Sequence, residues 1–218
     1  MVSIAVQSTF TLPSRADIVS RLATSPPLEE LLTSDDIERQ HFLAQQPLKP
    51  AAVLLLVVNH PGDPTVVFTQ RNADLADHAG QISFPGGRCD DADCTPERTA
   101  LREAEEEVGI PAERVEILGR LPEYLTSTGY AVTPVVGWAE PPLTFRPDPR
   151  EVADVFEVPL AFLLDAGNHR YESALQRGRL RNYWAMPYGE RFIWGATAGM
   201  LVTFHRILAP KPMTRKDF

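Results

Sequence analysis

Cysteine is scarce in this chain of 218 residues, which holds only Cys89 and Cys94. The two lie five positions apart in a polar stretch, and no further cysteine or histidine stands at the spacing of a zinc site. We therefore predict two incidental free thiols, with neither a disulfide framework nor a structural zinc ion.

Long apolar runs are also absent. No uninterrupted hydrophobic stretch approaches the roughly 20 residues that a membrane-spanning helix needs. The opening segment, residues 1–7, lacks the cationic start and the longer apolar run of a secretory signal. We expect a soluble, cytoplasmic protein with no membrane partner.

Positive charge is in short supply. Lys and Arg number 21 against 29 Asp and Glu, which gives a formal net charge of -8, and the basic residues form no run. Such a chain repels nucleic-acid backbones, so we predict no nucleic-acid partner. A phosphorylated small molecule remains compatible with this charge, provided that metal ions mask the charge of substrate and site together.

The residues that are present suffice for one globular core, since 44% are hydrophobic and no internal repeat divides them. Near the N-terminus, Ser14 is placed to cap a short helix over 15–23, and the composition of 28–45 is helical. The predicted division is a helical arm over 1–49, a main domain over 50–210 and a tail over 211–218.

Strands and helices alternate in the main domain. The continuous apolar run Ala51–Val58 predicts a buried strand, and a turn at 61–64 leads to a second strand over 65–69. Gly86 and Gly87 predict a turn. Further strands are predicted at 115–121, 130–138 and 152–158, and helices after Thr95, at 160–165 and at 197–208. This alternation predicts an α/β or α+β sandwich with a mixed rather than purely parallel sheet.

The densest chemical signal is the run Arg102-Glu103-Ala104-Glu105-Glu106-Glu107-Val108-Gly109. In a helix closed by Gly109, residues Glu103, Glu106 and Glu107 stand at i, i+3 and i+4 on one face, where like charges oppose helix formation. Hard divalent cations such as Mg²⁺ or Mn²⁺ compensate for this repulsion, because carboxylate oxygens are their preferred ligands. The run therefore predicts metal-assisted phosphate chemistry.

The same run carries a family resemblance. Together with Gly86-Gly87 and a polar loop before it, Arg102–Ile110 resembles the Nudix box, whose tail reads R-E-U-x-E-E-x-G-U with U apolar. Every position of that tail matches.

A second stretch, Val67–Gly87, is similar to the signature of the coenzyme A pyrophosphatase branch of this family, L-L-T-x-R-[SA]-x-x-x-R-x-x-x-G-x-x-x-F-P-G-G. Thr69, Arg71, Gly80 and the run from Phe84 to Gly87 fit it, whereas Asn72 and Ala76 depart from it. The loop before the box tail is one residue longer than the strict pattern, as it commonly is in that branch.

The resemblance implies a Nudix α/β/α sandwich with a mixed sheet, and hydrolysis of the pyrophosphate bond in a nucleoside diphosphate linked to another moiety. For coenzyme A or acyl-coenzyme A the products would be 3′,5′-ADP and the 4′-phosphopantetheine part. The implied cofactor is Mg²⁺ or Mn²⁺, and the implied partner is a small-molecule nucleotide. A homodimer is also compatible with it, since related folds often pair through their arms and strands.

Roles follow for individual residues. We expect Glu103, Glu106 and Glu107 to be the catalytic metal ligands and Arg102 to orient a carboxylate through a charge-assisted hydrogen bond. We expect Gly86 and Gly87 to bring backbone close to metal or phosphate, Arg71 to contact substrate phosphate and His78 to be structural. The general base is a box glutamate or one of Glu123, Glu140, Glu151 and Glu157, with Glu151 the first choice among these four.

Two alternatives stay open. One is a Nudix pyrophosphatase for ADP-ribose, NADH or dinucleoside polyphosphates. ADP-ribose enzymes tend to carry a proline about fifteen residues beyond the box, where this chain has Leu125. The other is a nucleotide-binding module without catalysis, which would be expected to have lost a box glutamate. Because all three tail acids and the arginine are present, we predict an active enzyme.

Overall fold

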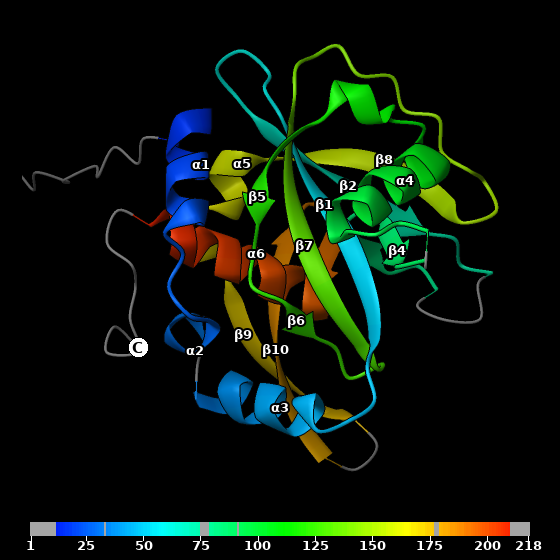
Figure 1. Cartoon of the computed structure of the whole chain (residues 1–218). Coiled ribbons are helices and arrows are strands. Elements are labelled where there is room, and N and C mark those ends of the chain that lie inside the picture. Colours follow the sequence, from blue (N-terminus) through cyan, green and yellow to red (C-terminus); the bar gives the residue numbers. More distant parts are fainter. Residues whose placement is uncertain (1–11, 33, 75–78, 91, 177–178, 210–218) are drawn as a thin grey trace, which may run out of the picture.

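The computed structural model describes residues 12–32, 34–74, 79–90, 92–176 and 179–209 (Figure 1). Its helices are α1 (Arg15–Ala23), α2 (Leu28–Leu31), α3 (Ser34–Ala44), α4 (Pro96–Val108), α5 (Leu160–Leu163) and α6 (Gly195–Leu208), with short 3₁₀ turns η1 (Ala112–Arg114) and η2 (Ala166–Asn168). Its strands are β1 (Lys49–Val58), β2 (Thr65–Arg71), β3 (Ile82–Ser83), β4 (Gly86–Arg88), β5 (Glu116–Arg120), β6 (Tyr124–Leu125), β7 (Tyr130–Ala139), β8 (Val152–Pro159), β9 (Arg170–Gln176), β10 (Arg179–Tyr188) and β11 (Arg191–Trp194).

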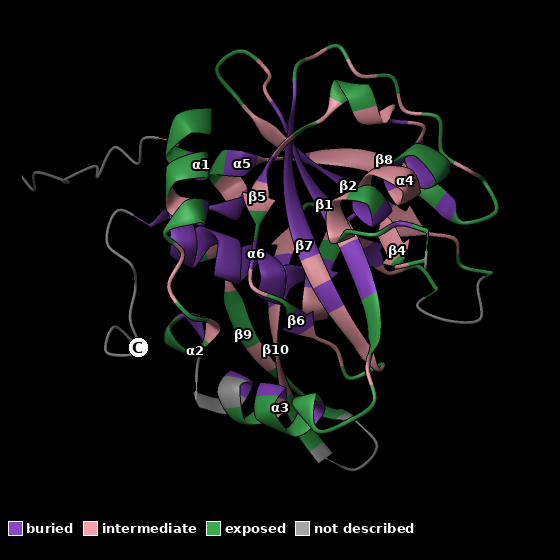
Figure 2. Ribbon diagram, in the orientation of Figure 1, coloured by how far each residue is buried: buried purple, intermediate pink, exposed green. Residues whose placement is uncertain are grey.

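The main sheet is mixed, as the sequence predicts. It has eight strands in the order β3-β2-β1-β7-β5, to which β4 adds on β1, β6 on β7 and β8 on β2. Strands β1 and β7 run parallel from the pair Lys49 and Tyr130 to the pair Val58 and Ala139, and the other pairs are antiparallel. The apolar run predicted as a buried strand forms most of β1 at the centre of this sheet, and most of its residues are buried (purple in Figure 2).

Helices cover both faces of this sheet. On one face, Ala100, Ala104 and Val108 of α4 pack on alternate residues of β1, namely Ala52, Leu54, Leu56 and Val58. On the other face, the larger core joins α6 to the opposite set, including Leu55 and Val57. Figure 1 shows α4 and α6 on opposite sides of the sheet. The predicted α/β/α sandwich is therefore confirmed.

Helix α4 begins and ends where the sequence predicts. The Thr95 side chain accepts a hydrogen bond from the Arg98 N–H, Pro96 occupies the first turn, and Gly109 closes the helix in the left-handed conformation at φ +71°. A Cβ at Gly109 would also lie 2.9 Å from that of Arg146. These local signals fix the register of the acidic run against the sheet.

The N-terminal helices pack on the core. Ser14 caps α1 as predicted, and Ile18 and Leu22 of α1 belong to the larger core cluster. The segment 28–45, predicted to be helical, forms two helices, because Leu32 is extended at ψ 156° and separates α2 from α3. Leu32 is buried, so tertiary packing outweighs local helix propensity there.

Two further differences concern strands. Gly86 and Gly87 lie in strand β4, paired with Val53 and Ala52, and not in the turn that the Gly-Gly pair predicts. The sequence also gives no prediction for the three-stranded sheet β11-β10-β9, which packs on α6. Among the described residues, no helix has both the length and the apolar character to cross a membrane. The tail 211–218 and His78 lie outside the described residues.

Candidate active site

The site lies where α4 faces strand β4. The Gly86 N–H donates a hydrogen bond of 3.1 Å to Glu107 Oε2, and the Glu107 carboxylate is buried. Gly87 lies against the carboxylate of Glu103, since a Cβ built on Gly87 would be 2.6 Å from Glu103 Oε1. The absence of a side chain at this glycine therefore lets the backbone of β4 approach the acidic helix.

Glu106 has a different environment from the other two box glutamates. Its side chain is 60% exposed and Oε2 accepts a 3.0 Å hydrogen bond from Arg102 Nη1. The structure thus brings Glu103 and Glu107 together against β4 and leaves Glu106 at the rim. Within the described part of the chain, no three His, Cys, Asp or Glu side chains form a ready cluster for a metal ion.

Arg102 connects these carboxylates. Its Nη1 lies 2.8 Å from Glu103 Oε1 and 3.0 Å from Glu106 Oε2, and its Nη2 donates to the Arg88 carbonyl oxygen at 3.1 Å. Its main partner is Asp93, which accepts from Nε at 3.1 Å and from Nη2 at 2.9 Å. The guanidinium is therefore held rigidly beside two of the predicted metal ligands.

Sequence reasoning missed Asp93. This residue is buried, accepts a further 2.9 Å hydrogen bond from Thr99 Oγ1, and caps the loop by accepting from the Asp90 N–H. Hydrogen bonds from Arg102 hold the pKa of its carboxyl far below the usual range. Its only sequence signal was an acidic loop ahead of the helix, and no helical spacing links it to Arg102.

The electrostatics of the site favour a cation. Burial raises the pKa of Glu107 to about 7, and the charges of Glu103 and Glu151 add to this effect, while the Gly86 N–H and Arg71 oppose it. Burial also raises the pKa of Glu103. The buried Glu107 and the partly buried Glu103, neighbouring carboxylates with raised pKa values, are stabilised when a divalent cation approaches. This donor set, composed of hard carboxylate oxygens beside a glycine-lined strand, fits a hard divalent cation.

Arg71 and Glu151 also lie at this site. Arg71 ends β2 with Nη1 at 3.9 Å from Glu107 Oε1, and its buried Nε has no hydrogen-bond partner among the described residues. Glu151 is exposed, and its carbonyl oxygen accepts from the Asn72 N–H at 2.8 Å. Because the charge of Glu151 raises the pKa of both Glu103 and Glu107, it lies within electrostatic range of the pair.

The other candidates for the general base have different surroundings. Glu157 lies 2.7 Å from His60 Nε2 and accepts from Thr65, at the opposite end of β2 from Arg71. Glu140 accepts from Trp138 Nε1 at 2.9 Å, and Glu123 is exposed ahead of β6. Only Glu151, of the four, acts on the pKa values of the paired carboxylates.

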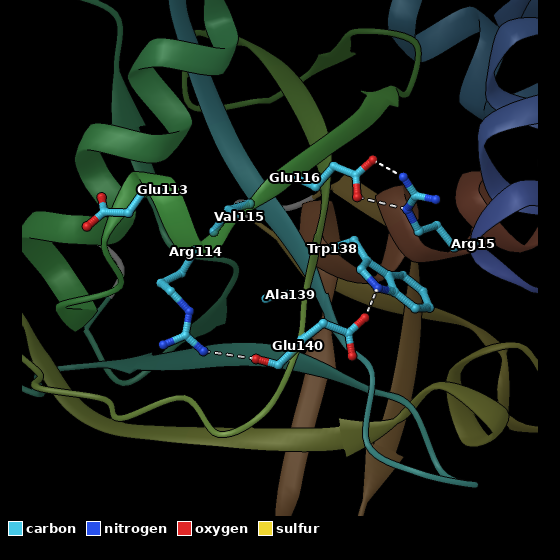
Figure 3. Close-up of a pocket in the computed structure, with 8 residues that line it drawn as sticks. All are labelled: Arg15, Glu113, Arg114, Val115, Glu116, Trp138, Ala139 and Glu140. Atoms are coloured by element: carbon cyan, nitrogen blue, oxygen red, sulfur yellow. Dashed lines mark hydrogen bonds and ion pairs between the residues drawn. The ribbon is translucent and has the colours of Figure 1, made fainter.

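An open hollow of about 510 Å³ lies elsewhere, between α1, η1 and the end of β7 (Figure 3). Arg15 pairs with Glu116 on its wall, and Arg114 donates to the Glu140 carbonyl oxygen. None of the residues that line it belongs to the acidic site, which faces the amino-terminal half of β1.

An acidic helix packed against a Gly-Gly strand, on a mixed sheet covered by helices on both faces, is the arrangement of a Nudix-type hydrolase. The NUDIX domain family model matches residues 48–178. "Uncharacterized Nudix hydrolase NudL" of Escherichia coli (strain K12 / DH10B) is 44% identical over 164 residues, which cover 75% of this chain and 85% of that protein. The chain therefore belongs to the Nudix family, and it is a pyrophosphohydrolase of that family.

A second relative by sequence agrees with this assignment. The protein of the same name from Shigella flexneri serotype 5b (strain 8401) is 43% identical over 188 residues, which cover 83% of this chain and 97% of that protein. Among solved structures, the Nudix hydrolase RenU from M. smegmatis is 32% identical with a TM-score of 0.45, covering 51% of this chain and 70% of that one. Nudix enzymes act on small nucleotide substrates and generally use divalent metal ions.

Proposed function

We propose that this protein hydrolyses the pyrophosphate bond of coenzyme A or acyl-coenzyme A, giving 3′,5′-ADP and the 4′-phosphopantetheine part, with Mg²⁺ or Mn²⁺. The observation that carries this proposal is the position of Arg71, a residue of the coenzyme A signature. Its side chain lies beside the buried Glu107, and its Nε has no hydrogen-bond partner within the ranges that the structure describes. A guanidinium group left partly unpaired next to metal-binding carboxylates is suited to a substrate diphosphate.

Other signature residues support the same site. Thr69 Oγ1 lies 3.2 Å from Ser83 Oγ, which ties β2 to β3 just ahead of Phe84. The ring of Phe84 stacks on that of Phe68 at 5.2 Å between centroids. Arg71 on β2 and the glycine pair on β4 are both held against β1, with which each of these strands pairs.

Glu103, Glu106 and Glu107 are the proposed metal ligands. When bound there, the cation would neutralise charge on the diphosphate and lower the pKa of attacking water. Arg102 acts through other residues, since it positions Glu103 and Glu106 and takes its own orientation from Asp93. To act as a ligand, Glu106 would have to give up its contact with Arg102, which its exposed position allows.

Glu151 is the proposed general base. It is exposed to water, and it lies close enough to affect Glu103 and Glu107. A carboxylate within reach of the attacking water can accept its proton. Of the remaining acids weighed for this role, Glu157 is already engaged by His60 and Thr65.

The cellular location, the domain division and the oligomeric state are also matters of proposal. Both cysteines are free thiols, a state that a reducing cytoplasm maintains. We propose that residues 50–210 form the catalytic domain and that residues 1–49 form an N-terminal helical arm, of which α1 packs on the core. Any homodimer would be detected as a doubled mass in light scattering.

The test is a hydrolysis panel with the full chain in Mg²⁺ or Mn²⁺. Coenzyme A, acyl-coenzyme A, ADP-ribose, NADH and diadenosine polyphosphates are compared by kcat/KM, and products are identified by mass. We expect the highest value for coenzyme A or an acyl derivative, with 3′,5′-ADP as product. A higher value for ADP-ribose, NADH or a dinucleoside polyphosphate would reject the proposed substrate.

A further inference from the structure

Arg88 ends strand β4, one residue beyond Gly87. Its guanidinium donates to Tyr130 Oη from Nε at 2.9 Å and from Nη2 at 2.6 Å, and its Cζ lies 5.5 Å from the centre of the tyrosine ring. Its carbonyl oxygen accepts from Arg102 Nη2. Both the backbone and the head group of Arg88 are therefore fixed at the edge of the active site.

Lys49 stands beside this pair. Lys49 is the cross-strand partner of Tyr130, and Arg88 is the partner of Ala51, two residues further along β1. Cross-strand partners share a face and side chains alternate along a strand, so Lys49, Arg88 and Tyr130 lie on the same face of the sheet.

These cations lack acidic partners. Arg88 and Lys49 are both exposed, and neither forms an ion pair with a carboxylate in the part of the chain that the structure describes. Tyr130 offers Arg88 a neutral oxygen only. In a chain with a formal net charge of -8, two uncompensated cations beside one tyrosine form a local site for an anion.

The edge position of β4 connects this cluster to the carboxylates. Gly87 faces α4 and Glu103, whereas Arg88, the next residue, faces the opposite side of the sheet. Among the described strands, β4 pairs with β1 alone, so its other edge is not covered by a strand. This edge of β4 therefore lies between Glu103 on one face of the sheet and Arg88 on the other.

We infer that Arg88, held by Tyr130 and assisted by Lys49, binds a phosphate monoester of the substrate that is separate from the diphosphate. This inference rests on the proposed function, because coenzyme A carries such a group on the 3′-oxygen of its ribose. ADP-ribose, NADH and dinucleoside polyphosphates carry none. The fork of a guanidinium suits the oxygens of a dianionic monoester, and Lys49 supplies a second positive charge.

Binding of 3′,5′-ADP and of AMP to the full chain, measured by calorimetry without metal, tests this inference independently of catalysis. Wild type is expected to bind 3′,5′-ADP on the order of tenfold more tightly than AMP. Arg88→Gln should remove this preference and leave the affinity for AMP unchanged. Tyr130→Phe, which keeps the charge and the ring but removes the oxygen that orients Arg88, should reduce the preference.

The matched control is Arg98→Gln, which removes one charge from an exposed position on α4. It should retain the wild-type preference. The inference would be overturned if wild type bound the two nucleotides with equal affinity. It would also be overturned if Arg88→Gln lowered the affinity for both nucleotides equally. If Arg88→Gln lowers the melting temperature, the Tyr130→Phe variant is the deciding test. A preference for 3′,5′-ADP over AMP that is undiminished in Tyr130→Phe would reject the role given to Arg88.

Kinetics separate this inference from the proposed function. Arg88→Gln should raise KM for coenzyme A and leave KM for dephospho-coenzyme A unchanged. If wild type hydrolyses coenzyme A and the variant shows the same KM for it, the proposed function stands and the monoester site is rejected. If wild type hydrolyses neither compound yet prefers 3′,5′-ADP in calorimetry, the site stands and the proposed reaction is rejected.

Discussion

The backbone N–H of Gly86 donates directly to the carboxylate of Glu107, 21 residues further along the chain. This hydrogen bond joins the glycine strand to the acidic helix and leaves the other oxygen of Glu107 facing Arg71. It places one proposed metal ligand at a defined position before any cation binds. Preorganisation of this kind reduces the reorganisation that catalysis requires.

Substitution of the two glycines of β4 by alanine is expected to have different outcomes. In Gly87→Ala the atoms nearest to the new methyl group would be those of the Glu103 carboxylate, the end of a flexible side chain. We expect Glu103 to be displaced, with a loss on the order of 10- to 100-fold in kcat/KM and little change in melting temperature.

Gly86→Ala is the comparison. Its Cβ would lie 2.4 Å from the Ala52 carbonyl oxygen, at a φ of +154°, so backbone would have to move. This variant is expected to lose stability as well as activity. Equal melting temperatures for the two variants, measured by calorimetry, would contradict the distinction.

Glu107→Gln tests the buried carboxylate. The amide retains size and an acceptor for the Gly86 N–H but removes the negative charge, so folding should persist. We expect kcat to fall by about 10²- to 10⁴-fold in saturating Mg²⁺ or Mn²⁺, the range for loss of a central catalytic group. Steady-state kinetics across a metal titration would measure both the rate and the metal dependence.

Glu105→Gln is its matched control. Glu105 is an exposed glutamate of the same helix, two residues before Glu107 and outside the cluster that faces β4. It should retain nearly wild-type rates and metal dependence. Similar losses in the two variants would indicate a general charge effect and would contradict a specific role for Glu107.

Asp93→Asn tests the support of Arg102. The substitution removes the negative charge of the carboxylate group that accepts hydrogen bonds from Nε and Nη2 of this guanidinium. We expect Arg102 to become less well ordered and kcat/KM to fall on the order of tenfold, with a lower melting temperature.

Metal affinity should weaken in the same Asp93 variant, because Arg102 positions Glu103 and Glu106. Isothermal titration with Mn²⁺ measures this effect apart from turnover. An unchanged affinity together with a reduced melting temperature would restrict Asp93 to a role in folding.

The buried position of His205 predicts that the fold loses stability at acidic pH. Its buried Nε2 has no hydrogen-bond partner among the described residues, and its ring contacts His169 at 4.9 Å between centroids. Burial lowers the pKa of His205 from 6.5 to about 4, and the charge of His169 adds to this effect. Because the folded-state pKa lies below the unfolded value, this contribution to stability is present above pH 6.5 and is lost as the pH falls toward 4.

Urea unfolding of wild type and His205→Gln at pH 7 and pH 4.5 measures this dependence. The variant should lose less unfolding free energy between the two values, by up to about 3 kcal/mol. His41→Gln, at an exposed position on α3, should behave as wild type does. Parallel pH profiles for wild type and His205→Gln would exclude the buried histidine as the cause.

Much of the fold follows from short-range signals in the sequence. Thr95, Pro96 and Gly109 determine the bounds of α4, and Ser14 determines the start of α1, because caps and left-handed glycines act on adjacent backbone. The apolar run that forms β1 determines the centre of the sheet, since only a buried strand suits it.

Tertiary structure alone decided the rest. Glu106 and Glu107 are adjacent and chemically identical. Glu106 is exposed and contacts Arg102, whereas Glu107 is buried and accepts from the Gly86 N–H. Only the packing of α4 against β4 distinguishes the two. The pairs formed by Arg102 with Asp93 and by Arg88 with Tyr130 likewise join segments whose spacing carries no periodic signal. The sequence by itself determined which helices and strands form and which acidic residues lie together on α4, since both depend on residues that are close in the sequence. Which acids are buried, and which cations remain unpaired, depended on contacts between distant segments, which local propensity does not encode.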